Sequence, residues 1–141
     1  MEPKYMMFFM ISNLSMASDT FLLADAGYDV WLANTRGNSY SRAHNTLTME
    51  NEDFWEFSFH EIGFYDLPAL IDFIRKETAF HQLMFIGHSQ GATAFLVMCS
   101  MKPEYNERVI LFQALAPLYI FKHAKFTKND VMKVRKFVRE T

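Results

Sequence analysis

The chain has 141 residues, of which 50% are apolar, and its formal net charge is −2. A chain of this length is long enough to bury the core of one domain, and its nearly balanced charge gives no general attraction to nucleic acid. The single cysteine, Cys99, excludes an internal disulfide, and no apolar run reaches the roughly 18 residues of a membrane span. We therefore expect one domain over residues 1–141 and no nucleic-acid partner.

Four apolar runs have the length of buried strands, and the segments between them have helical character. The expected strands cover residues 5–11, 30–33, 83–86 and 109–116, and the expected helices cover residues 18–26, 66–77 and 92–98. Strands that alternate with helices form a mostly parallel sheet covered on both faces. The predicted fold class is therefore α/β.

The first run, YMMFFMI at residues 5–11, has two interpretations. It fits a buried parallel strand, which we favour. It also fits the short hydrophobic region of a signal peptide, preceded by Lys4 and followed by a weak cleavage site. Asn13 begins an Asn-Leu-Ser glycosylation sequon, which has meaning only in a secreted chain.

The first two helices carry recognisable end signals. Ser18 or Asp19 is expected to cap the first helix, and Gly27 fits the position just after its end. Asp66 is expected to cap the second helix, where Pro68 occupies the first turn and its missing N–H does no harm. The apolar residues of the second helix repeat at helical spacing, so we expect this face to pack against the sheet.

The stretch between the second strand and the second helix is polar at first and then aromatic. Its polar loop turns at residues 36–38, and the simplest interpretation of Arg36 and Arg42 is a solvated loop surface. Residues 53–59 read DFWEFSF. Aromatic residues at this density are typical of packing, and we do not interpret them as a ligand cage.

Residues 87–91 read Gly-His-Ser-Gln-Gly between the third strand and the last predicted helix. In this context a Gly-x-Ser-x-Gly motif forms a nucleophile elbow, a sharp turn that exposes the serine Oγ at the sheet edge. Gly87 and Gly91 suit the crowded turn, and the amide of Gln90 can point at a developing oxyanion. Ser89 is therefore a candidate nucleophile. The alternative is a glycine-rich turn whose serine only caps the helix.

The last segment, residues 118–141, is basic and differs in character from the rest. From residue 121 onward it holds seven Lys or Arg residues against one Asp and one Glu, and Val131, Val134 and Val138 have helical spacing. Two interpretations stay open, a solvated amphipathic helix and a basic helix that touches an anionic lipid surface. The valines would also suit a surface that covers the apolar edge strand at 109–116.

Four segments together carry a family resemblance. They are GYDVWLANTRGNSYSR at 27–42, DFWEFSFHEIGFYDLPALIDFI at 53–74, GHSQG at 87–91 and ALAP at 114–117. With these segments the chain resembles the acid lipase family, the α/β-hydrolase group that includes gastric and lysosomal acid lipases. The resemblance covers roughly residues 15–117. It implies an α/β-hydrolase fold and hydrolysis of triacylglycerols or steryl esters, with Ser89 as nucleophile and Gln90 as one oxyanion amide. It also implies that His88 is not the catalytic histidine.

The chain departs from the family pattern at both ends. The family takes its second oxyanion amide from a His-Gly-Leu segment, whereas residues 10–14 here read MISNL, so Asn13 is only the nearest positional equivalent. The family's lid, triad acid and triad histidine follow the part that matches ALAP, and this chain ends at Thr141. We therefore interpret the chain as a partial α/β-hydrolase that lacks the lid and the C-terminal strands.

No histidine in the chain is an obvious substitute for the missing base. His123 is the only histidine after Ser89, and nothing in the sequence places it within the ~3 Å that proton transfer requires. His44, His60 and His81 are interpreted as structural or solvated. Without a base, Ser89 is a weak nucleophile.

Two functional hypotheses follow. The first is a lipid ester hydrolase of the acid lipase type, and the second is a catalytically inactive lipase remnant that binds lipid or a partner. We expect no cofactor and no metal. The expected partners are a lipid ester substrate and, through the basic segment at 118–141, a lipid surface. By resemblance to the family the expected location is secreted or lysosomal.

Overall fold

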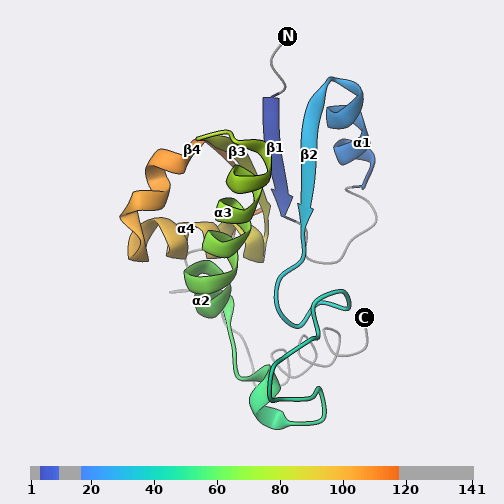
Figure 1. The fold of residues 1–141 in the computed structure, drawn as a ribbon, viewed down its shortest axis with the longest axis vertical. Coiled ribbons are helices and arrows are strands. Elements are labelled where there is room, and N and C mark those ends of the chain that lie inside the picture. The colour runs from blue at the N-terminus through green and yellow to red at the C-terminus, as the bar shows by residue number, and fades with distance from the viewer. Residues whose placement is uncertain (1–3, 10–16, 118–141) are drawn as a thin grey trace.

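The computed structural model describes residues 4–9 and 17–117, and its centre is a four-stranded sheet (Figure 1). The strands are β1 (Lys4–Phe9), β2 (Tyr28–Ala33), β3 (Leu83–His88) and β4 (Val109–Leu115). They lie in the order β2-β1-β3-β4, and every pairing is parallel. The predicted strands are thus confirmed, with shifts of a few residues at their ends. Because the strands are parallel, their carboxyl ends meet at one edge of the sheet.

Helical segments make each crossover between parallel strands, as a parallel pairing requires. After β1 comes α1 (Ala17–Asp25). After β2 come the 3₁₀ turn η2 (Glu52–Trp55), α2 (Phe59–Glu61), the π-helix η3 (Ile62–Asp66) and α3 (Leu67–Thr78). After β3 come α4 (Gln90–Met101) and the 3₁₀ helix η4 (Pro103–Arg108). Within the described ranges, no helix has the length and apolar character that crossing a bilayer demands.

The helices cover both faces of the sheet, but unequally (Figure 1). The α3 and α4 helices cover one face, where the core includes the fully buried side chains of Leu67, Ile71, Phe85 and Met98. On the same face Phe95 stacks on Phe112 with ring centroids 4.0 Å apart. Among the described helices, α1 covers the other face (Figure 1), which holds a smaller apolar cluster around Ile86. A groove of about 340 Å³ remains between α1 and the ends of β3 and β4.

One continuous helical segment runs from α2 through η3 into α3. It begins with a capping box. The Ser58 side chain accepts a hydrogen bond from the backbone N–H of Glu61, and the Glu61 carboxylate accepts one from the backbone N–H of Ser58. The predicted cap at Asp66 is therefore wrong. Asp66 has helical backbone angles and makes no side-chain cap, because the helical segment has already begun at Phe59, seven residues earlier. Pro68 lies in the first turn of α3 as predicted.

The π-helix lies close against α4 through a glycine. A Cβ at Gly63 would lie 2.4 Å from the Ala94 carbonyl oxygen and 2.8 Å from the Val97 Cβ. Only a residue without a side chain allows this approach. This contact between η3 and α4 helps to position α4, which begins directly after Ser89.

The first helix differs slightly from its prediction. It starts at Ala17, so Ser18 and Asp19 lie inside its first turn rather than at its cap. Its end is confirmed, because Gly27 has φ +86° and its N–H donates to the Ala24 carbonyl. A left-handed residue at this position is a common helix ending.

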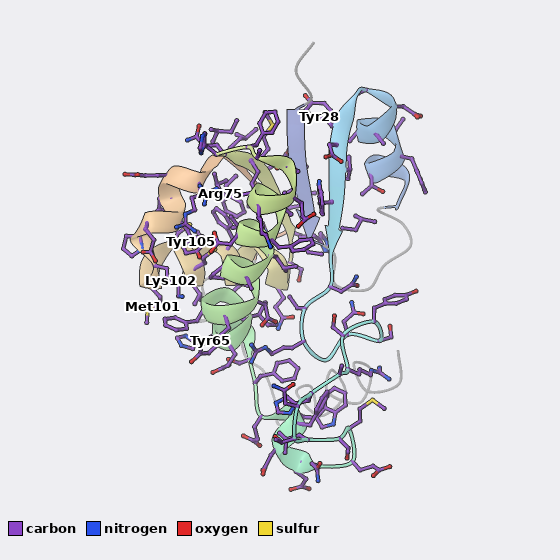
Figure 2. The ribbon with its side chains drawn as sticks, in the orientation of Figure 1. Tyr28, Tyr65, Arg75, Met101, Lys102 and Tyr105 are labelled. Atoms are coloured by element: carbon purple, nitrogen blue, oxygen red, sulfur yellow. The ribbon has the colours of Figure 1, made fainter. Side chains whose placement is uncertain are left out.

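A polar cluster fastens η4 to α3 on the outer surface, where Figure 2 labels Tyr105 and Arg75. The Tyr105 hydroxyl donates to the Asp72 carboxylate at 2.7 Å, and Arg108 pairs with the same carboxylate. Burial, and then the hydrogen bond to Asp72, raise the pKa of Tyr105. Cys99 packs beside the core of this face, and burial raises its pKa as well, which agrees with a packing role.

Candidate active site

Ser89 occupies the single residue between the end of β3 and the start of α4. Its backbone angles are φ 49° and ψ −114°, which a residue with a side chain adopts only under constraint. Its side chain makes no cap hydrogen bond to α4. The alternative interpretation of Ser89 as a simple helix cap is therefore wrong. The turn leaves the serine half-exposed at the carboxyl edge of the sheet.

Gly87 makes the sharp turn sterically possible. A Cβ at this position would lie 2.8 Å from the Ala92 nitrogen and 2.9 Å from the Ala92 Cα. Both contacts are with backbone atoms, which cannot rotate away. The predicted need for a residue without a side chain at Gly87 is confirmed.

Hydrogen bonds hold the two peptide groups that flank Ser89. On one side the Ser89 N–H donates to the Leu115 carbonyl of β4 at 2.8 Å. On the other side the Ser89 carbonyl accepts from the N–H groups of Ala92 and Thr93, at 3.1 and 3.3 Å. The Thr93 hydroxyl, which is buried, also donates to this carbonyl at 3.4 Å. Both torsions of Ser89 are thereby restrained by its neighbours.

Gln90 presents its N–H away from the helix it begins. As the first residue of α4 it has no carbonyl four residues earlier within the helix to receive this hydrogen. The peptide bond is trans, so the Gln90 N–H points opposite to the Ser89 carbonyl, which is directed into α4. The positive end of the α4 dipole lies at the same place. This geometry suits an anionic oxygen bound beside Ser89.

The loop that follows β2 leaves from the same edge of the sheet and is anchored to η3. Arg36 donates to the Asp66 carboxylate through its backbone N–H at 3.0 Å, through Nε at 2.9 and 3.1 Å, and through its second terminal nitrogen at 2.6 Å. The prediction of Arg36 as a solvated loop residue is wrong. The partner lies 30 positions away, so no local pattern indicates it. The Arg42 Nε is also buried, and none of the residues that the structure describes forms a hydrogen bond with it.

Three of the described histidines, His44, His60 and His81, make contacts or take positions that do not involve Ser89. His44 accepts two backbone N–H bonds through Nδ1, from Thr46 and Leu47. His60 stacks on Phe64 with ring centroids 6.0 Å apart. His81 precedes β3 and therefore lies at the opposite end of that strand from Ser89. Asn13, His123 and the basic segment at 118–141 lie outside the described residues.

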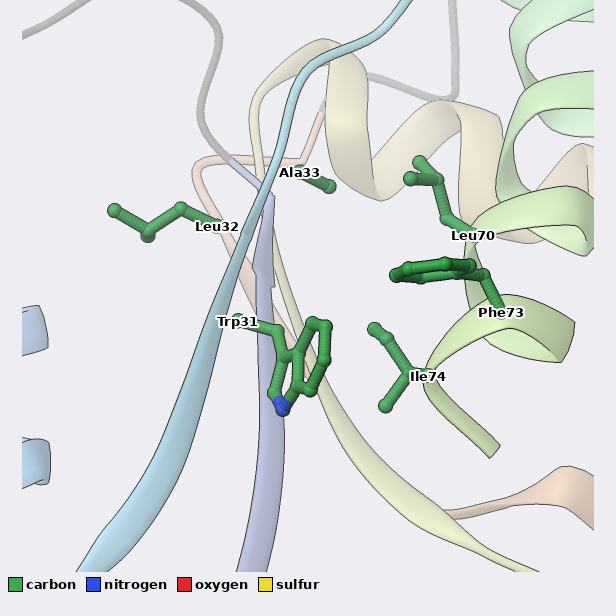
Figure 3. A pocket seen from close by; sticks show the side chains of 6 residues that line it. All are labelled: Trp31, Leu32, Ala33, Leu70, Phe73 and Ile74. Atoms are coloured by element: carbon green, nitrogen blue, oxygen red, sulfur yellow. The ribbon is translucent and has the colours of Figure 1, made fainter. Parts of the chain in front are cut away.

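A cavity of about 250 Å³ lies between β2 and α3, away from the elbow (Figure 3). Trp31 and Ala33 point toward α3, and Leu32 points to the other side of the strand. The Trp31 ring packs edge-on against Phe73 with centroids 6.0 Å apart. None of the lining residues belongs to the turn around Ser89, so we assign no catalytic role to this cavity.

Comparison with known proteins agrees with this geometry. Residues 17–140 match the family described as alpha/beta hydrolase fold. The chain belongs to the α/β-hydrolase family. The predicted fold class is confirmed, since the parallel sheet, the covering helices and the family match agree.

Within the α/β-hydrolases, the chain is similar to acid lipases. It is 59% identical over 105 residues to Lipase 1 of Drosophila melanogaster, covering 74% of this chain and 23% of the relative. It is 47% identical over 125 residues to human gastric triacylglycerol lipase, covering 89% of this chain and 31% of the relative. It is 46% identical over 108 residues to human lysosomal acid lipase/cholesteryl ester hydrolase, covering 77% and 27%. The predicted resemblance to acid lipases is confirmed.

The chain spans about a quarter to a third of the length of these curated relatives. Among solved structures, an epoxide hydrolase mutant from Vigna radiata matches with a TM-score of 0.54 and 20% identity, covering 94% of this chain and 38% of that chain. This likeness supports the α/β-hydrolase fold and carries no information about the reaction.

Two features of the α/β-hydrolase elbow escape prediction from the sequence. One is the Leu115 carbonyl, which holds the Ser89 N–H. The other is Ala116, whose φ of 46° lies in the left-handed region. Every residue has a backbone carbonyl, so the sequence does not indicate which one holds Ser89. Alanine normally has a negative φ, so its presence at position 116 does not predict a positive one.

Proposed function

We propose that this chain carries the nucleophile of a lipid ester hydrolase of the acid lipase type, with Ser89 attacking the ester carbonyl. The observation that carries the proposal is the constrained backbone of Ser89, at φ 49° and ψ −114° between β3 and α4. The Ser89 side chain makes no cap hydrogen bond to α4, and Ser89 is partly exposed at the carboxyl edge of the sheet. The similarity to gastric and lysosomal acid lipases supports the same assignment.

The proposed reaction begins when the Ser89 Oγ bonds to the ester carbon and the carbonyl oxygen becomes an oxyanion. The Gln90 N–H is proposed as one donor to that oxyanion, where preorganised backbone donors lower the barrier. The backbone amide of Asn13 is proposed as the second donor by position in the family pattern. A general base must take the Ser89 proton, since a serine hydroxyl is weakly nucleophilic by itself.

The substrate class is proposed from the relatives. One is named as a triacylglycerol lipase and another as a cholesteryl ester hydrolase. We extend to this chain the two substrate classes that these names give, triacylglycerols and steryl esters. A secreted or lysosomal location is proposed on the same basis. Contact with a lipid surface through residues 118–141 is proposed from their basic, amphipathic pattern.

The first experiment is labelling of the purified chain with a fluorophosphonate probe, which reacts with activated serines. Ser89→Ala is the test variant, and Ser100→Ala is the matched control because Ser100 is an exposed serine near the other end of α4. We expect wild type and Ser100→Ala to be labelled and Ser89→Ala to be unlabelled. Circular dichroism on the same samples reports whether each one is folded.

A folded wild-type chain that stays unlabelled would contradict the hydrolase proposal. That result would favour the second hypothesis, an inactive remnant that binds lipid or a partner. Labelling that survives Ser89→Ala would assign the reactivity to another residue. Labelled wild-type protein would next be tested on short-chain and long-chain esters.

A further inference from the structure

The carboxyl end of β4 holds a second strained residue beside the elbow. Among the residues that the structure describes, three other than glycine have positive φ: Ala79 at 59°, Ser89 at 49° and Ala116 at 46°. Ala79 ends α3 as a left-handed cap, which is an ordinary role. Ala116 follows Leu115 directly, and its side chain is exposed. Packing of its methyl group therefore does not explain its conformation.

Ala116 adjoins the peptide group that holds Ser89. His88 pairs with Leu115 in the parallel register of β3 and β4. The hydrogen bond from the Ser89 N–H to the Leu115 carbonyl, at 2.8 Å, is thus the last one between these strands, one residue beyond β3. The φ of Ala116 is the first torsion after that carbonyl. If it relaxed to the usual negative range, either the Leu115 carbonyl or the chain after it would have to turn.

The two peptide groups around Ser89 have different supports. The carbonyl side is held within α4 by Ala92 and Thr93, which are helix residues. The N–H side depends on one hydrogen bond to β4. A shift of the Leu115 carbonyl would release the torsion φ of Ser89, and the direction of its Oγ would follow. The strain at Ser89 therefore relies on the conformation kept at Ala116.

We propose that Ala116 is a positioning residue for Ser89, keeping the Leu115 carbonyl aimed at the Ser89 N–H and so holding the serine Oγ in its reactive direction. The consequence for reactivity rests on the proposed function. The consequence for geometry does not, since it concerns one backbone hydrogen bond.

The test uses a matched pair of substitutions. Ala116→Val introduces a β-branched side chain, which disfavours positive φ. Ala79→Val makes the same change at an exposed residue at the end of α3 that also has a positive φ. Ala116→Gly accepts the positive φ without strain. The readouts are fluorophosphonate labelling, resolved into probe affinity and maximal rate, and amide hydrogen exchange at Ser89 measured by NMR.

We expect Ala116→Val to lower the maximal labelling rate by about tenfold, with unchanged probe affinity, because a small misplacement of a reacting group can cost up to about 10²-fold in rate. We expect its Ser89 amide to exchange about tenfold faster, since its hydrogen bond opens locally. Ala116→Gly should match wild type in both readouts. Ala79→Val should lose global stability while its labelling and Ser89 exchange stay at wild-type values.

Two results would overturn the proposal. One is wild-type exchange at Ser89 in folded Ala116→Val. The other is an equal loss in Ala79→Val, which would mean that general destabilisation is the cause. If folded wild-type protein is unlabelled, the proposed function fails, and the exchange comparison alone decides whether Ala116 positions Ser89. If Ala116→Val does not fold, slower labelling or faster Ser89 exchange in Ala116→Gly would contradict the proposal, and wild-type values would support it.

Discussion

Asp66 shows how one carboxylate can organise a loop that local sequence leaves undetermined. Its side chain is 14% exposed and accepts from the backbone and the guanidinium of Arg36. The bond to the backbone N–H fixes the start of the loop, and the paired bonds to the guanidinium fix its direction. The loop after β2 and the π-helix η3 are therefore held together at the edge of the sheet where Ser89 lies.

We predict that Asp66→Asn lowers the free energy of unfolding by about 2 kcal/mol, because a partly buried Arg36 then loses its charged partner. Urea denaturation followed by circular dichroism measures the change. Glu104→Gln is the control, since it makes the same chemical change at an exposed carboxylate, and surface substitutions of this kind stay within about 0.5 kcal/mol. Equal stability losses in the two variants would contradict a special role for Asp66.

The continuous helical segment from α2 to α3 depends on its first turn. The Ser58 N–H donates to the Glu61 carboxylate at 2.7 Å, and the Ser58 hydroxyl donates to it at 2.8 Å. The backbone bond from Ser58, and then its hydroxyl, lower the pKa of Glu61 below its ordinary value of 4.5. The cap is therefore strongest when Glu61 is ionised, and it begins the helix that positions both Gly63 and Asp66.

We predict that the Glu61 contribution to stability depends on pH. Because the pKa is lower in the folded chain, the contribution is fully present above pH 4.5, the ordinary value, and is lost as the pH falls through the lowered value. Urea denaturation of wild type and Glu61→Gln should show a stability difference near neutral pH that disappears in acid. In a Ser58→Ala background the difference should shrink, because one donor is gone. A difference that persists at acid pH would contradict this account.

At the scale of the whole molecule, the sheet has apolar outer strands. β2 and β4 are the outer strands of the described sheet. Leu32 on β2 is 61% exposed, and Ile110 and Leu111 on β4 are 56% and 51% exposed. Exposed apolar outer strands are templates for pairing with another chain. The exposed apolar residues of β2 and β4 therefore form two surfaces that are suited to association with another chain.

We predict that the purified chain associates as its concentration rises and that Leu111→Lys weakens this association. A lysine on an outer strand opposes edge-to-edge pairing through charge and solvation. Sedimentation velocity across a concentration series measures the effect. Leu96→Lys is the control, because Leu96 is an exposed leucine on the surface of α4, away from a strand edge. An equal effect of both lysines would point to general solubility and would contradict pairing through β4.

Much of the architecture was predictable from the sequence because it depends on local patterns. Apolar runs of strand length predict the four strands, helical spacing predicts α3, and the apolar stretch at 92–98 after the elbow motif predicts α4. The elbow was predictable for the same reason, since Gly-His-Ser-Gln-Gly lies between a strand and a helix and its glycine at 87 meets backbone in the structure. The cap at Asp66 was mispredicted because the residue suits capping locally, while its carboxylate bonds to Arg36 across 30 positions.

The sequence by itself determined the α/β character of the chain, the position of Ser89 and the resemblance to acid lipases, because residue identity and spacing carry these properties. Only the tertiary structure decided which groups hold Ser89 in place. The Leu115 carbonyl reaches the Ser89 N–H because β3 and β4 pair in one register, and Ala116 takes a positive φ at the end of that pairing. Backbone contacts of this kind depend on strand pairing, which joins residues far apart in the chain and leaves no local signal.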